Sequence, residues 1–84
     1  MIRILYFARL RERLGLAEEE LNCRHGANTV ADLIVHLRSR GGRWAETLPE
    51  GERLMAAVNQ VLARPETPIR DGDEVGIFPP VTGG

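Results

Sequence analysis

The last six residues of the chain, 79–84, have types and spacing that suit one kind of chemistry. Pro79 and Pro80 fix the backbone dihedral φ and remove two amide donors, so this segment is expected to leave the domain stiff and extended. At about 3.3–3.6 Å per residue, six extended residues reach roughly 20 Å. Gly83 and Gly84 then offer the terminal carboxylate with no side chain beside it. The segment predicts an acyl end that another protein encloses, and a frayed chain end is the alternative.

A free carboxylate is a poor electrophile, because its pKa lies near ~3.5 and it is fully ionised at neutral pH. It becomes reactive once it is activated, for example as a mixed anhydride with AMP. If the terminus does chemistry, the sequence therefore predicts a partner enzyme that uses ATP.

The composition excludes several other classes of function. With 11 basic and 12 acidic residues the net charge is -1, which argues against nucleic acid or an anionic membrane as the partner. No apolar run approaches the ~20 residues of a membrane span. A single cysteine excludes an intramolecular disulfide and suits the reducing cytoplasm. All the basic residues are arginine, so no lysine amine on this chain could accept the activated carboxyl group.

Side chains for an internal active site are scarce. Cys23 and His25 share i, i+2 spacing, but His36 is the only other soft ligand candidate, and a catalytic zinc site needs three protein ligands. The same cysteine–histidine pair has no third group to orient it as a nucleophile and base. A turn explains Asp71 and Asp73 without calcium. We therefore expect no metal site and no active site within the chain.

The clearest helix is predicted between Thr29 and a stop at Gly41 and Gly42. Thr29 and Asp32 have the spacing of a capping box. The apolar residues of this segment recur at positions i, i+3, i+4 and i+7, and they are Val30, Leu33, Ile34 and Leu37. Such a helix carries a single apolar stripe, so it can cover one face of a sheet and must leave the other partly open.

Five strands are predicted around this helix, over residues 2–8, 18–23, 54–58, 61–63 and 74–78. A short helical segment over residues 8–14 stops at Gly15, and a short irregular or helical segment over 43–48 places Trp44 on the core. This order predicts an α+β roll with the outline of a β-grasp fold: a mixed sheet of about five strands packed on one main helix. The first strand is expected beside the last. Residues 1–78 would form the domain, and residues 79–84 the extended tail.

Several segments of the sequence match a known family. They are residues 1–8 (MIRILYFA), Arg11 with Glu12, residues 57–60 (AVNQ), residues 71–75 (DGDEV) and residues 78–84 (FPPVTGG). Together they resemble the small-subunit family of molybdopterin synthase. The resemblance runs the length of the chain, and it implies a ubiquitin-like β-grasp fold.

The resemblance implies a sulfur carrier that is not an enzyme on its own. A ubiquitin-activating-type adenylyltransferase would adenylate the Gly84 carboxylate with ATP and magnesium, and a sulfur donor of the cysteine desulfurase or rhodanese type would convert it to a thiocarboxylate. The tail would enter the large catalytic subunit, in an assembly of two small and two large subunits. It would give its sulfur to cyclic pyranopterin monophosphate, forming the dithiolene of the molybdenum cofactor. The chain itself would bind no cofactor.

By the same resemblance, Gly84 carries the chemistry, and six other residues bind partners: Gly83, Thr82, Val81, Pro80, Phe78 and Arg11. A side chain at Gly83 would clash in a narrow channel, and the backbone of Val81 and Thr82 would pair with the partner like an added strand. Phe78 would anchor either partner, although an ordinary core position also fits it. Arg11 equally fits a solvated helix turn.

Three rival functions share the Gly-Gly end: a sulfur carrier for thiamin, a sulfur carrier for tRNA thiolation, and a ubiquitin-like protein modifier. The FPPVT spacing before the glycines favours the molybdopterin family over them. A rival of another class is a non-catalytic β-grasp binding module with an inert tail.

Overall fold

The computed structural model describes residues 1–22, 28–48 and 54–79. The elements in chain order are β1 (Ile2–Tyr6), α1 (Ala8–Leu14), β2 (Glu18–Leu21), α2 (Val30–Arg38), α3 (Arg43–Thr47), β3 (Met55–Val58), β4 (Val61–Ala63) and β5 (Glu74–Phe78). The five predicted strands are present, although the first ends at Tyr6, because Ala8 already belongs to α1, and residue 23 of the second lies outside the described residues. The helical segments are present as well, and the segment after Gly42 is a helix.

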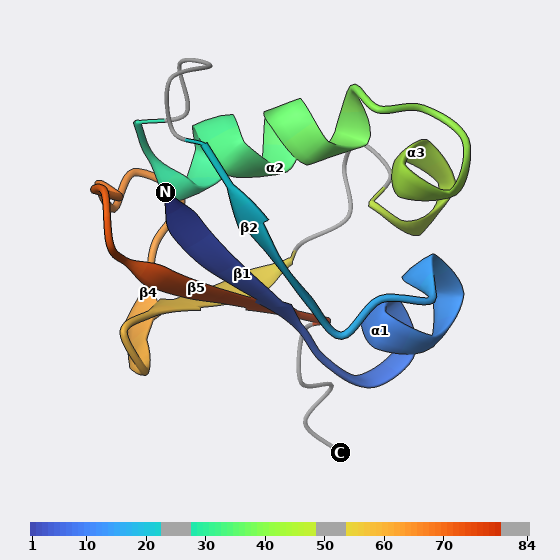
Figure 1. Ribbon diagram of the computed structural model, residues 1–84, viewed down its shortest axis with the longest axis horizontal. Coiled ribbons are helices and arrows are strands. Elements are labelled where there is room, and N and C mark those ends of the chain that lie inside the picture. The colour runs from blue at the N-terminus through green and yellow to red at the C-terminus, as the bar shows by residue number, and fades with distance from the viewer. Residues whose placement is uncertain (23–27, 49–53, 80–84) are drawn as a thin grey trace.

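The five strands form one mixed sheet in the order β2-β1-β5-β3-β4 (Figure 1). β1 and β5 run parallel, whereas the pairs β1–β2, β3–β5 and β3–β4 are antiparallel. The first strand therefore lies beside the last, as the sequence predicts, and β5 occupies the centre of the sheet. These features confirm the β-grasp roll.

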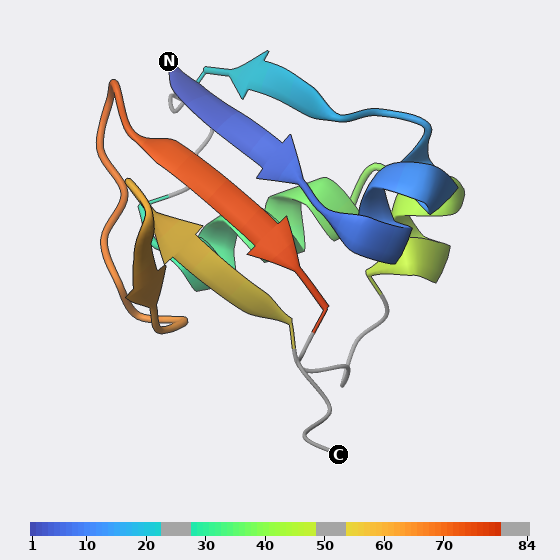
Figure 2. The same cartoon turned by 90° about the horizontal axis from the view of Figure 1, so that it is seen from below.

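Among the described residues, helices cover one face of the sheet and none covers the other (Figure 1 and Figure 2). Along β1 the side chains of Ile2, Ile4 and Tyr6 are buried, while Arg3 between them is exposed. Figure 2 views the sheet from the side opposite α2, and no helix lies in front of the strands. We call the side facing α2 the covered face and the other side the open face.

The main helix begins and ends through local hydrogen bonds. The Thr29 hydroxyl accepts the backbone N–H of Asp32 at 3.2 Å, while the Asp32 carboxylate accepts the N–H of Asn28, one residue ahead of the cap. α2 ends at Arg38, two residues before Arg40, the last helical residue that a stop at Gly41 predicts. The N–H groups of Arg40 and Gly41 donate to carbonyls three residues back, so the last turn tightens before Gly41 reverses the chain with φ of 74°.

The core lies between the covered face and the helices. Its buried hydrophobic members among the described residues are Ile2, Ile4, Tyr6, Leu10, Leu14, Val30, Leu33, Leu37, Leu48, Ala56, Ile69, Val75 and Ile77. Ile34, the fourth residue of the predicted stripe, is half-buried at its edge, and Trp44 packs against the core as predicted.

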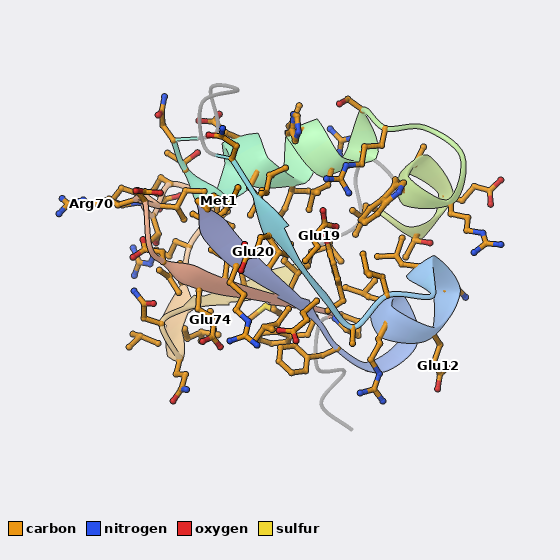
Figure 3. The ribbon with its side chains drawn as sticks, viewed as in Figure 1. Met1, Glu12, Glu19, Glu20, Arg70 and Glu74 are labelled. Atoms are coloured by element: carbon orange, nitrogen blue, oxygen red, sulfur yellow. The ribbon has the colours of Figure 1, made fainter. Side chains whose placement is uncertain are left out.

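A polar cluster of four side chains, which we call the clamp, fastens the helices to the covered face. The Tyr6 hydroxyl donates to Glu19 Oε2 at 2.8 Å, and Arg40 donates to both Glu19 oxygens at 2.9 and 2.8 Å. The Arg40 guanidinium lies 4.4 Å above the Trp44 ring, whose centroid is 5.6 Å from that of Tyr6 in an edge-on contact. Glu19 and Glu20, labelled in Figure 3, project to opposite sides of β2. The clamp thus ties β1 and β2 to α3 and to the end of α2.

The clamp changes the acidity of its own members. Burial of the Glu19 carboxyl favours its neutral form, but the hydrogen bonds from Arg40 and Tyr6 and the guanidinium charge outweigh burial and lower the pKa of Glu19. Burial, and secondly the bond to Glu19, raise the pKa of the Tyr6 hydroxyl, so Tyr6 stays a donor.

The clamp should make stability depend on pH in the acid range. Because the pKa of Glu19 is lower in the folded state, its contribution is complete above the unfolded value of about 4.3 and is lost as the pH falls through the folded value. We expect Glu19→Gln to lower the melting temperature most at pH 7, with the difference from wild type shrinking toward pH 3. Thermal melts by circular dichroism across this range measure it.

Glu20→Gln, on the exposed opposite side of β2, is the matched control, and its melting temperature should stay close to that of wild type at pH 7. A Glu19→Gln difference that is constant from pH 7 to pH 3 would contradict the role of the ionised carboxylate.

Candidate functional site

Most of the predicted site lies outside the described residues: Pro80, Val81, Thr82, Gly83 and Gly84. What the structure places is the root of the tail, Phe78 and Pro79. Phe78 is the last residue of β5, the central strand. Because β1 and β5 are parallel, the end of β5 lies beside the end of β1, where the Phe7 N–H donates to the Ile77 carbonyl at 3.1 Å.

Apolar side chains gather on the open face near this root. Register places Leu5 and Ala57 on either side of Gly76, Met55 beside Phe78, and Leu62 beside Ala57. With Phe7 these residues form what we call the apolar patch: Leu5, Phe7, Met55, Ala57, Leu62, Gly76 and Phe78. Phe7 is 45% exposed and Leu62 65% exposed. An exposed apolar patch is a candidate surface for protein association.

An aromatic pair sits at the end of the patch where the tail begins. The rings of Phe7 and Phe78 make an edge-on contact, with centroids 6.4 Å apart and planes at 76°. Phe78 is half-buried and is not a member of the core cluster. Its position on the open face is compatible with the anchoring role predicted for it, and not with an ordinary core position.

Arg11 is exposed on α1, whose Leu10 and Leu14 are buried in the core. α1 begins one residue after Phe7 and contacts β5, so Arg11 lies on an element that flanks the tail root. The two predicted site residues that lie within the described residues, Arg11 and Phe78, are thus brought to the same end of the sheet. Binding of a partner by Arg11 stays a prediction.

The other end of the open face is charged. Arg3 donates to Glu18 Oε2 at 2.6 Å, and Glu20 and Glu74 are its register partners on the two neighbouring strands (Figure 3). A shallow hollow of about 280 Å³ lies there, lined by Arg3, Glu18, Glu19 and Glu20. Its arginine and two of its carboxylates are already engaged in ion pairs. In the part of the chain that the structure describes, no group of three His, Cys, Asp or Glu side chains could hold a metal ion.

Sequence reasoning found Phe78 and missed the rest of the apolar patch. The available signal was strand alternation in residues 2–7, where both the odd and the even positions include large apolar side chains. Since Ile4 and Tyr6 face the core, Leu5 and Phe7 must face outward. A strand that is apolar on both sides, beside a face that no helix covers, indicates a surface that another protein covers.

Comparison with known proteins agrees with the fold. The ThiS family matches residues 4–84. The molybdopterin synthase sulfur carrier subunit of Escherichia coli is 45% identical over 84 residues, which cover 100% of both chains.

Two solved structures are similar as well. A putative molybdopterin converting factor subunit 1 from Pyrococcus furiosus superposes with a TM-score of 0.74 at 34% identity, covering 95% of this chain and 97% of that one. A complex of subunits 1 and 2 of the molybdopterin-converting factor from Helicobacter pylori contains a chain that matches with a TM-score of 0.62 at 25% identity, covering 99% of this chain and 97% of that one. No helix among the described residues is long and apolar enough to cross a membrane. The match over nearly the whole sequence, on a β-grasp sheet that ends in a Gly-Gly tail, shows that the chain belongs to the ThiS family.

Proposed function

We propose that this chain is the sulfur-carrier small subunit of a molybdopterin synthase. The observation that carries the proposal is the 45% identity to the E. coli sulfur carrier subunit over the full length of both chains. The chain is the sulfur-donating part of an enzyme complex and has no activity alone. We place its work in the cytoplasm, because activation of the terminus consumes ATP.

The chemistry takes place at the Gly84 carboxyl group. An adenylyltransferase of the ubiquitin-activating type, using ATP and magnesium, joins a carboxylate oxygen to the α-phosphorus and releases pyrophosphate. The terminal sulfur of a persulfide on a donor of the cysteine desulfurase or rhodanese type then attacks the acyl carbon, and AMP leaves. A thiol reduces the acyl disulfide that this forms, which breaks its S–S bond and releases the sulfur on the chain terminus. The resulting Gly84 thiocarboxylate enters the large catalytic subunit and gives its sulfur to cyclic pyranopterin monophosphate. Two such transfers supply the dithiolene of molybdopterin.

The described fold supports this use of the terminus. β5 is the central strand and is bonded on both sides, so its end at Phe78 is a fixed point from which the tail starts. The apolar patch spreads from that point over the open face, and the subunit that receives the tail can cover it. The second subunit of the molybdopterin-converting factor is the partner we assign to this surface, because a similar chain is solved in complex with that subunit.

The direct test is intact-mass spectrometry of the chain after incubation with its activating enzyme, ATP, magnesium and sodium sulfide. We expect a gain of about 16 Da, because one carboxylate oxygen is replaced by sulfur. Reactions without ATP serve as the control and should leave the mass unchanged. An unchanged mass in the complete reaction would count against the proposal.

The pathway is tested by rescue of a strain that lacks its own molybdopterin synthase small subunit. Recovery of molybdoenzyme activity supports the proposed function. A chain that gains the 16 Da yet fails to rescue, while restoring a thiamin-carrier or tRNA-thiolation mutant, belongs to one of the rival sulfur pathways.

A further inference from the structure

Gly76 lies at the middle of the apolar patch, on the central strand β5. It is paired in register with Leu5 of β1 and Ala57 of β3. Although it faces the open side of the sheet, Gly76 is buried, because the ring of Phe7 lies over it. A Cβ atom added at Gly76 would be 2.9 Å from Phe7 Cε2, and 3.7 and 3.8 Å from two further ring atoms.

The backbone around Phe7 fixes the direction from which this ring arrives. Its N–H donates to the Ile77 carbonyl, and its carbonyl accepts the N–H of Leu10 at 3.2 Å, at the start of α1. The next residue, Ala8, has φ of 54°, the left-handed conformation that an alanine rarely adopts. The chain therefore turns sharply after Phe7, and the side chain extends from the end of β1 across β5.

We propose that Gly76 is a positioning residue for docking: it is the seat that lets the edge of the Phe7 ring rest on β5, with the ring against Phe78 at the root of the tail. This inference rests on the proposed function, because the docked protein is the second subunit of the molybdopterin-converting factor. A side chain at position 76 lifts the ring off the sheet and separates it from Phe78. The displaced Phe7 ring then projects toward the partner, close to the place where the tail enters the partner.

The distance of the Phe7 ring from the sheet should affect how well the partner binds both the apolar patch and the tail. Aromatic side chains at the centre of an interface contribute most when they fill a closely matched, dry surface. The tail and the patch must engage the same partner together, so a raised ring at the root also displaces the tail. Because the close atom belongs to the far end of a half-exposed side chain, the ring can move toward solvent, and the fold tolerates the added methyl group.

The first experiment measures binding of the second subunit by isothermal titration calorimetry. We expect Gly76→Ala to raise the Kd about fivefold, in the range of an interface residue that matters, while the melting temperature stays within a few degrees of wild type. Ala31→Ser also adds one atom, but on α2 at the covered side of the sheet and outside the apolar patch, and is the control with an expected change below about twofold. If both variants raise the Kd for the second subunit equally, the proposed role of Phe7 is overturned.

A double-mutant cycle separates the seat from a direct contact. Phe7→Ala removes the ring, so adding Gly76→Ala to that variant should change the Kd no further if Gly76 acts through Phe7. An additional fivefold loss in the double variant would overturn the proposal, because Gly76 would then touch the partner itself.

NMR of the isolated chain tests the seat without any partner. The edge of the Phe7 ring should shift the Gly76 Hα resonance that faces it downfield, because a proton in the plane of an aromatic ring is deshielded, and Phe7→Leu should return it toward ordinary strand values. Unshifted resonances in wild type would overturn the seat. Failure of wild type to bind the second subunit would overturn the proposed partner and the docking role together. If wild type binds the second subunit and Gly76→Ala has the same Kd as wild type, the docking role of Gly76 alone is overturned.

Discussion

Replacing Leu37 with aspartate is expected to unfold the domain. Leu37 is 0% exposed and lies on the face of α2 that packs on the sheet. Losing its burial removes about 1.5–3 kcal/mol, and an unpaired carboxylate in the core costs several kcal/mol more. A domain of this size has only about 4–12 kcal/mol of net stability, so the two losses together remove most or all of it.

Circular dichroism and urea denaturation measure this result. Val35→Asp introduces the same side chain two residues away on the same helix, where the native residue is 54% exposed, and it should remain folded. If Leu37→Asp melts cooperatively within a few degrees of wild type, the assignment of α2 as the helix that builds the core is wrong.

The contrast between Leu37 and Val35 shows why the fold could be predicted from the sequence. In a helix, the spacing of apolar residues decides which side is buried, and the stripe from Val30 to Leu37 has that spacing. In the strands, period-two alternation and the turns at Asn59 and Gly72 gave the bounds within a few residues. Both turn positions have positive φ, at 51° and 91°, which their residue types tolerate.

The clamp and the seat were not predictable in the same way. Glu19 is one of three consecutive glutamates, and nothing in that run indicates which carboxylate meets Arg40, 21 positions later. Phe7 and Gly76 are likewise 69 positions apart, and their contact depends on the parallel pairing of β1 with β5. Such contacts arise from tertiary structure, which local periodicity does not encode. The tail could be proposed from the sequence because its proline and glycine residues have a local meaning of their own, and its role stays a prediction.

Deleting Gly84 is expected to abolish sulfur transfer while leaving the domain as stable as before. Among the described residues, every buried hydrophobic side chain lies between Ile2 and Ile77, so the core does not depend on the last residue. The deletion withdraws the terminal carboxyl group by about 3.3–3.6 Å. Misplacing a reacting atom by about 1 Å can already lower a rate 100-fold. We therefore expect sulfur transfer by the shortened chain to fall below the limit of detection.

Two measurements on the same preparations decide this prediction: the melting temperature, and the gain of about 16 Da with the activating enzyme, ATP and sulfide. Thr82→Ser keeps the length of the tail and is the control that should still gain sulfur. A large fall in melting temperature on deletion would mean that the terminus is part of the folded domain. Sulfur uptake by the shortened chain would mean that reach does not limit activation. The proposed function depends on a separation of roles: the sheet holds the root of the tail in place, and the partner proteins carry out the chemistry at its tip. Either result would contradict that separation.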